Sequence, residues 1–109
     1  MAQIDIDAAY ALMNKIPFKR GNTVVQVFDD GLEGLSSEML LHGNVIAWVT
    51  PRSEQLWISH SGFMTRTTKN RLNALPNVNI VQRNYMWYLN GTYWAGTNQY
   101  IGDGIPQVW

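Results

Sequence analysis

The first periodic pattern of apolar residues lies near the N-terminus, in residues 5–16. Apolar side chains recur there at three- and four-residue spacing, which predicts an amphipathic helix, and Pro17 ends the pattern. Asp5 or Asp7 can cap the first turn, where a carboxylate meets free N–H groups and the positive end of the helix dipole. The apolar positions of this helix are Ala8, Ala9, Leu12, Met13 and Ile16.

A second helical pattern covers residues 65–75 and is much more polar. Thr65 or Thr67 is the expected N-cap, and Pro76 ends the helix. The expected buried stripe consists of Thr68, Leu72 and Leu75. The opposite, polar and positive face carries Arg66, Lys69, Asn70, Arg71 and Asn73.

β-Branched and aromatic residues dominate most of the remaining segments, which predicts strands. Trp48 and Trp57 lie at comparable distances from a four-residue turn and are expected to pair across a hairpin. Asn90-Gly91 is the preferred sequence of a type I′ turn and predicts a second, aromatic hairpin. Residues 19–22 are expected to form a turn, and the pattern assigns no element to residues 31–37. The predicted strands are residues 23–28, 38–41, 45–49, 55–59, 78–82, 86–89 and 92–94.

This order of elements predicts the fold class. Sequential hairpins, rather than alternating strand–helix units, are typical of an antiparallel sheet. We therefore expect an α+β fold in which an antiparallel sheet of about five to six strands carries two packed helices. The length of 109 residues is typical of one domain, residues 1–109. Residues 96–109, with three glycines and a proline, are expected to be an irregular tail whose closing Val108-Trp109 docks on the domain or engages a partner.

Composition excludes several classes of protein. The chain has no cysteine, so disulfides, thiol nucleophiles and thiolate metal sites are excluded. Its 46% hydrophobic residues are typical of a folded chain. No apolar run approaches the roughly 20 residues that a membrane span needs, and the N-terminus lacks the features of a signal peptide. A soluble, cytoplasmic protein without membrane contact is expected.

The charges cancel in total but are unevenly distributed. Eight Lys and Arg balance eight Asp and Glu, so the whole molecule has no field that would steer it toward nucleic acid. Residues 1–62 contain four bases and seven acids, a net charge of −3, whereas residues 63–109 contain four bases and one acid, a net charge of +3. Such a dipolar surface can serve self-association or a charged partner, or can be ordinary surface scatter.

Residues that could carry catalysis are few. Residues from which a Ser-His-acid arrangement could be built are Ser59, Ser61, His42, His60, Glu38 and Glu54. None of them lies in a supporting motif such as a Gly-x-Ser-x-Gly elbow. Two isolated histidines supply no metal-ligand spacing, and the glycines do not fit a phosphate-binding loop. We expect no catalytic residue, no metal and no cofactor.

The most informative constellation is the basic helix followed by the aromatic hairpin. Cations beside flat aromatic faces suit single-stranded nucleic acid, and Arg, Trp and Tyr are also enriched in hot spots of protein interfaces. Alternation places Trp87 and Leu89 on one face of the hairpin and Met86 and Tyr88 on the other, so one of the two faces covers the core. The candidate binding residues are Arg66, Lys69, Arg71, Arg83, Tyr85, Trp87, Tyr93 and Trp94.

Residues 40–96 contain several segments with a recognisable pattern. They include the stretches at 41–47 and 56–59, the Gly-aromatic-x-Thr-x-Thr-Thr-x-x-Arg-Leu-Asn segment at 62–73, and Trp-Tyr-Leu-Asn-Gly at 87–91. In these segments the chain resembles small proteins encoded by tailed bacteriophages. The resemblance implies a phage origin and a role in the cytoplasm of an infected bacterium. It assigns no activity and no catalytic or binding residue.

Three functions are consistent with these observations. The first is a non-enzymatic phage protein that binds a host bacterial protein, and modulates or inhibits it, through exposed aromatic and arginine side chains. The second is a nucleic-acid-binding protein that uses the same surface, with the four bases on phosphates and Trp87 or Trp94 stacking on bases. The third and most distant is a small hydrolase built on His42 or His60. A homodimer through the hairpin edge or the Trp109 tail would compete with partner binding for the same aromatic residues.

Overall fold

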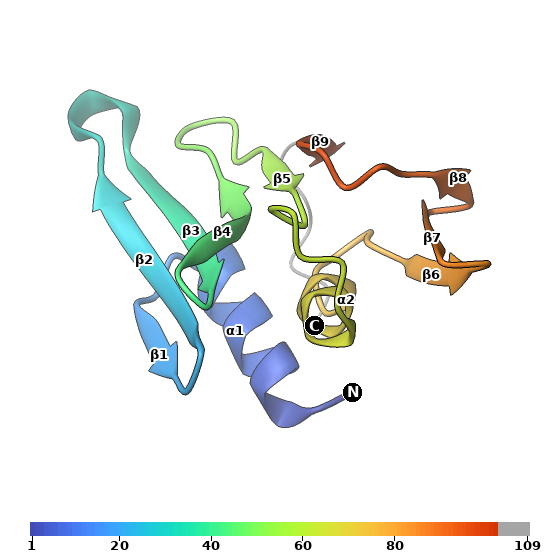
Figure 1. The fold of residues 1–109 in the computed structure, drawn as a ribbon. Helices are drawn as coiled ribbons and strands as arrows, with labels where there is room; N and C mark the ends of the chain where they lie inside the picture. Colours follow the sequence, from blue (N-terminus) through green and yellow to red (C-terminus); the bar gives the residue numbers. More distant parts are fainter. Residues whose placement is uncertain (103–109) are drawn as a thin grey trace.

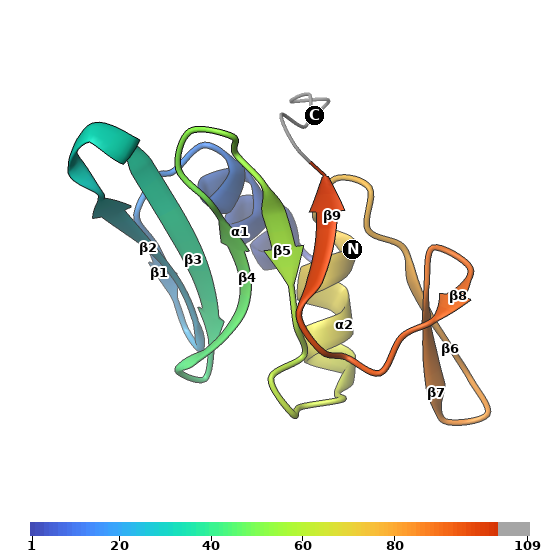
Figure 2. The ribbon, with the colours of Figure 1, turned by 90° about the horizontal axis from the view of Figure 1, so that it is seen from above.

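The computed structural model describes residues 1–102 of the chain. It confirms an α+β fold in which every strand pairing is antiparallel. The strands are divided between two sheets, one of six strands and one of three, with a helix between them (Figures 1 and 2). The described chain is elongated, with extents of 45 × 28 × 26 Å.

The six-stranded sheet has the order β1-β2-β3-β4-β5-β9. Trp48 pairs with Trp57 across the β4–β5 hairpin, as expected, and the two rings stack with centroids 6.2 Å apart. Tyr100 of β9 extends this row, 5.4 Å from Trp57. The strands are β1 (Phe18–Arg20), β2 (Thr23–Asp29), β3 (Leu35–Leu41), β4 (Asn44–Val49), β5 (Leu56–Ile58) and β9 (Gln99–Gly102), with a 3-10 turn η1 (Gly31–Glu33) between β2 and β3.

Two helices lie on one side of this sheet (Figure 2). Helix α1 (Gln3–Met13) packs against β1 to β4 through its apolar stripe, and Ala8 and Leu12 are fully buried. Helix α2 (Arg66–Asn73) contacts β4, β6 and α1. Thr65 is its N-cap, since its hydroxyl accepts a hydrogen bond from the amide of Thr68 at 3.2 Å.

The second sheet consists of β6 (Ile80–Arg83), β7 (Met86–Leu89) and β8 (Thr92–Tyr93), in that order. The predicted Asn90-Gly91 turn joins β7 and β8, and both residues have positive φ. The predicted alternation is confirmed, because Trp87 and Leu89 are buried while Met86 is exposed and Tyr88 half-buried. The inner face of this small sheet therefore completes the core, and no element of residues 1–102 covers its outer face.

Several expectations about local structure were wrong. Helix α1 begins at Gln3 with Ala2 as its N-cap, so Asp5 and Asp7 lie inside the helix rather than at its cap, and the helix ends at Met13 rather than at Ile16. Residues 18–20 form strand β1, where a turn was expected from residue 19, because Phe18 and its neighbours pair with the start of β2. Strand β3 begins at Leu35 rather than at residue 38. Residues 99–102 form β9 and pair with β5, although the tail was expected to be irregular from residue 96. The expected docking of Val108-Trp109 lies outside the described residues.

Candidate functional site

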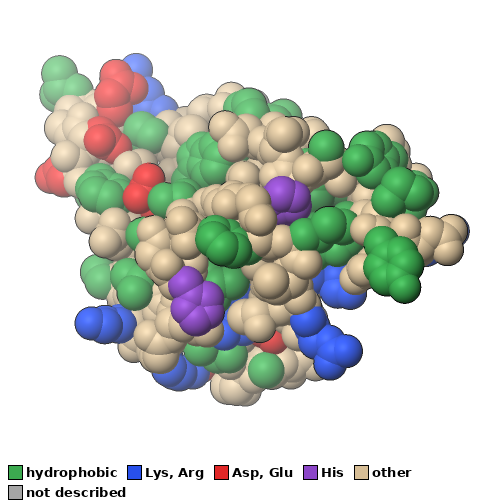
Figure 3. Space-filling model, viewed as in Figure 1, with side chains coloured by type: hydrophobic (Ala, Val, Ile, Leu, Met, Phe, Trp, Pro, Cys, Tyr) green, Lys and Arg blue, Asp and Glu red, His purple; other side chains and the backbone are tan. Residues whose placement is uncertain are grey.

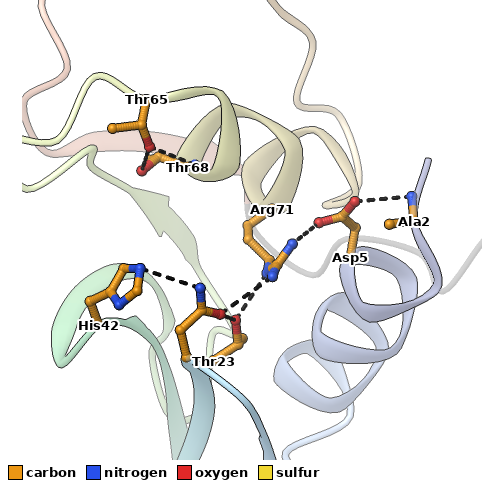
Figure 4. A network of polar contacts seen from close by, with 8 residues as sticks. Ala2, Asp5, Thr23, His42, Thr65, Thr68 and Arg71 are labelled. Carbon is orange, nitrogen blue, oxygen red and sulfur yellow. Dashed lines mark hydrogen bonds and ion pairs between the residues drawn. The ribbon is translucent and has the colours of Figure 1, made fainter.

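Arg71, one of the eight candidate binding residues, is buried between the two helices and strand β2 (Figure 4). Its guanidinium forms an ion pair with Asp5 of α1 and donates a hydrogen bond to the hydroxyl of Thr23 at 3.0 Å. The second carboxylate oxygen of Asp5 accepts a hydrogen bond from the amide of Ala2 at 3.1 Å. A buried cation with this set of partners holds three elements together and is not available to a ligand.

Trp87 and Trp94 are buried as well, with 1% and 6% of their surface exposed. They pack on each other and around the ring of His60, with all three centroid distances between 5.7 and 6.2 Å. The indole N–H of Trp94 donates to the carbonyl of Thr97 at 3.0 Å. The indole nitrogen of Trp87 is the only buried side-chain nitrogen or oxygen in residues 1–102 without a hydrogen-bond partner. Both tryptophans therefore belong to the core.

The other five candidate residues remain accessible to a partner. Arg66 and Arg83 are exposed, and Lys69 is partly exposed. Within residues 1–102 none of these three cations forms an ion pair. Tyr85 and Tyr93 are among the most exposed aromatic side chains, at 87% and 57%. Of the eight candidate binding residues, three are thus structural and five lie on the surface.

The outer face of the second sheet gathers part of this surface into one patch. Directly paired residues of antiparallel strands point to the same side of a sheet. Val81 pairs with Tyr88 and Tyr88 with Tyr93, while Arg83 pairs with Met86. These residues form what we call the aromatic face: Val81, Arg83, Met86, Tyr88 and Tyr93.

The aromatic face lies on paired strands, and within residues 1–102 no other element covers it. Its rings lie on strands, and Tyr88 contacts Tyr93 edge to face, with centroids 6.2 Å apart. Val81 and Met86 are 40% and 42% exposed, values that are high for apolar side chains in a paired strand. Figure 3 shows apolar side chains gathered at this end of the molecule. A contiguous exposed apolar patch of this kind is typical of an interaction site.

Tyr85 lies at the edge of the aromatic face, in the turn between β6 and β7. Its φ of 68° and the φ of 50° at Asn84 define a turn in which both central residues are left-handed. In the three comparable turns of the described chain, glycine occupies the second position, as Gly43, Gly62 and Gly91. A tyrosine at this position is strained and makes few contacts, so stability does not explain it.

The histidines contribute no catalytic arrangement in the described residues. The Nδ1 atom of His60 accepts a hydrogen bond from the amide of Gly62 at 2.9 Å. The hydroxyls of Ser59 and Ser61 donate to backbone carbonyl groups rather than to an imidazole. The ring of His42 contacts the side-chain amide of Asn22 at 3.3 Å. No serine hydroxyl is therefore paired with a histidine in residues 1–102.

A hollow of about 250 Å³ lies between the β3–β4 turn and the start of α2. Apolar side chains and three threonines line it, and His42 is its only titratable residue. Acid–base catalysis by two groups would need a second titratable side chain. Among residues 1–102, no three His, Asp or Glu side chains come together as metal ligands.

One carboxyl group outside the aromatic face has a perturbed pKa. The pKa of Asp7 is lowered from its usual range, first by a hydrogen bond from the side chain of Gln3 at 2.7 Å and next by one from Arg20 at 2.8 Å. Because Asp7 is solvated on the surface of α1, this shift reflects local pairing and is not evidence of a site.

The fold and the exposed face define a small α+β protein whose distinctive feature is an uncovered aromatic surface. Comparison with protein families places it among phage proteins. The family model described as Kyanoviridae Gp96 protein matches residues 1–105, so the chain belongs to this family. None of the curated proteins and none of the solved structures matches the chain. Within residues 1–102, neither helix has the length and apolar character needed to cross a membrane.

The family match bears out the expected phage origin and extends it to the N-terminal segment, which the resemblance had left out. Sequence reasoning missed two parts of the exposed surface. The exposure of Val81 and Met86 on the aromatic face could not be predicted, because it depends on which side of the second sheet is covered. Leu32, 95% exposed in the 3-10 turn, lies in a segment to which the pattern assigned no element.

Proposed function

We propose that this chain is a non-enzymatic phage protein that binds a host protein through the aromatic face, in the cytoplasm of the infected cell. The observation that carries the proposal is the composition of the face. It presents two tyrosines, an arginine and two apolar side chains on paired strands. Tyr and Arg are the residues that most often dominate the binding energy of protein interfaces.

Within residues 1–102, the unpaired charge of Arg83 and the strained backbone of Tyr85 also support the proposal. Arg83 has no ion-pair partner within residues 1–102, so a carboxylate of a partner protein can bind it without displacing an existing contact. Tyr85 is held in a strained backbone conformation with most of its surface in solvent. Local strain of this kind is found mainly where a function requires the side chain.

The nucleic-acid alternative loses much of its support. It needed four basic residues for phosphates and tryptophans for stacking. Arg71 is neutralised by Asp5, and both Trp87 and Trp94 are buried. The cations that remain for phosphates in this part of the chain are Arg66, Lys69 and Arg83.

Capture from nuclease-treated host lysate tests the proposal, with Tyr93→Ala as the variant and Tyr10→Ala as its matched control. The two tyrosines have similar exposure, 57% and 51%, but Tyr10 lies on α1, outside the aromatic face. We expect the wild-type chain and Tyr10→Ala to retain the same host protein, and Tyr93→Ala to lose it. Equal retention by both variants would contradict the assignment of the aromatic face. Recovery of nucleic acid alone, without nuclease treatment, would favour the alternative.

A further inference from the structure

The end of the molecule opposite the aromatic face carries an acidic and apolar tip, residues 28–35, which comprises the end of β2, the 3-10 turn η1 and the start of β3. Its most exposed side chain is Leu32, at 95%, and Phe28 and Leu35 are 42% and 44% exposed. Asp29 and Asp30 flank this apolar group and form no ion pair within residues 1–102. Together the three apolar side chains form an exposed apolar group beside carboxylates, which a second molecule can cover.

The carboxylates of the tip are held in place by local hydrogen bonds. Asp29 accepts one from the amide of Gly31 at 2.9 Å, and Asp30 accepts one from the hydroxyl of Ser36 at 2.6 Å. Glu33 pairs with Arg52 at 3.2 Å. The shape of the tip is therefore defined before any partner binds, which lowers the entropy cost of an interface.

The tip and the aromatic face cannot meet within one molecule. Figure 2 shows the connection between β2 and β3 at one end of the molecule and strands β6, β7 and β8 at the other. The long axis of the described chain is 45 Å. Any contact between these two surfaces must therefore join two molecules.

The two surfaces are chemically complementary. The tip offers carboxylates, which accept hydrogen bonds, around an apolar group that protrudes. The aromatic face offers donors, the guanidinium of Arg83 and the hydroxyls of Tyr88 and Tyr93, around apolar ring surfaces. Opposite charges and exposed apolar side chains therefore occur at the two ends of one chain.

We propose that two copies of this chain associate head to tail, with the acidic tip of one copy on the aromatic face of the next. Because the contacting surfaces differ, the association is heterologous: each added copy leaves a free tip and a free face. The tip then occupies the surface to which we assign host binding, so host protein and self-association compete for it. This inference rests on the proposed function of the aromatic face. The acidic tip, in contrast, takes part only in self-association.

Sedimentation velocity over a wide range of protein concentration tests the inference with two single variants. Leu32→Asp removes the apolar contact of the tip, and Arg83→Glu places a negative charge opposite the carboxylates. Both side chains are exposed, so neither change affects the core. We expect the wild-type chain to form assemblies that grow with concentration, and each variant alone to associate at least roughly tenfold more weakly.

An equimolar mixture of the two variants gives the decisive result. The Arg83→Glu copy keeps an intact tip and the Leu32→Asp copy an intact face, so we expect a one-to-one dimer that grows no further. Ile16→Asp is the control, since Ile16 is also an exposed apolar residue, at 44%, but lies outside both surfaces. A monomeric wild-type chain at all concentrations, or a mixture that fails to dimerise, would overturn the inference.

Host capture separates this inference from the proposed function. Leu32→Asp leaves the aromatic face intact, so it should retain the host protein at least as well as the wild-type chain. Loss of self-association with retained capture is the expected result. If Leu32→Asp lost both, the tip itself would contact the host, and the competition proposed between host and second copy would be refuted.

Discussion

Replacing Tyr85 by glycine should stabilise the fold and weaken binding at the same time. In the β6–β7 turn Tyr85 has a φ of 68°, in the left-handed region that glycine adopts without steric cost. Its side chain is 87% exposed, so its removal sacrifices little packing. The position is equivalent to that of Gly91 in the β7–β8 turn, where φ is 89°.

The size of the effect follows from two opposing terms. Release of left-handed strain at a non-glycine residue contributes about 1–2 kcal/mol. Glycine also gives the unfolded chain more conformational freedom, which offsets about 0.4–1 kcal/mol. The free energy of unfolding should therefore rise by about 1 kcal/mol, which corresponds to an increase in Tm of roughly 5 °C for a domain of this size.

Urea denaturation of the wild-type chain and Tyr85→Gly measures this change, with the slope m expected to stay constant. Gly91→Tyr is the reciprocal control: a Cβ at Gly91 meets no atom within 4 Å, so only backbone strain should destabilise this variant. Host affinity of Tyr85→Gly should fall about tenfold, since a contact worth about 1.4 kcal/mol is lost. A destabilised Tyr85→Gly would contradict the backbone strain at this position. A more stable variant with unchanged host affinity would contradict a host contact of Tyr85.

Three further predictions concern the core and the surface of α1. Arg71→Met leaves a buried carboxylate without its cation and should cost about 3–5 kcal/mol in urea denaturation, and a loss below about 1 kcal/mol would contradict the burial of this pair. Trp87→Phe removes an N–H that has no acceptor, whereas Trp94→Phe removes a hydrogen bond. The free energy of unfolding should therefore fall by at least about 1 kcal/mol less in Trp87→Phe than in Trp94→Phe. Equal losses of stability in the two variants would contradict this. Gln3→Ala should raise the pKa of Asp7 toward its usual value in an NMR titration. Because the pKa of Asp7 is lowered in the folded state, the stabilising contribution of Asp7 is present at neutral pH and is lost as the pH falls through that pKa. Gln3→Ala should therefore lose less stability on acidification than the wild-type chain. An unchanged pKa of Asp7 in this variant would refute the assigned cause.

Local signals in the sequence predicted much of the fold. The Asn90-Gly91 turn and the Thr65 cap were predictable because each depends on the conformational preference of one or two residues. The pairing of Trp48 with Trp57 followed from their spacing around a short turn. Alternation also separated Trp87 from Met86 correctly, since strand geometry sends successive side chains to opposite faces.

The remaining features depend on contacts between distant segments. Arg71 lies three residues after Thr68 and four before Leu75, so helical spacing places it on the buried stripe, and its assignment to the polar face followed its charge instead. Its charge is accommodated there because Asp5, 66 residues earlier in the chain, packs beside it. Strand β9 is four residues long and forms by pairing with β5, a distant segment of the chain. For the same reason the candidate site could be predicted as a region but not as a surface: which aromatic residues are exposed depends on the side of the second sheet that α2 and the core cover.

Photo-crosslinking in infected cells tests directly whether the aromatic face binds a host protein. A photoreactive phenylalanine analogue at position 93 lies on the aromatic face, and the same analogue at position 10 lies on α1 with similar exposure. We expect a crosslink from position 93 to one host protein and none to that protein from position 10. A host crosslink that forms from position 10 but not from position 93, or crosslinks from position 93 to nucleic acid alone, would contradict it.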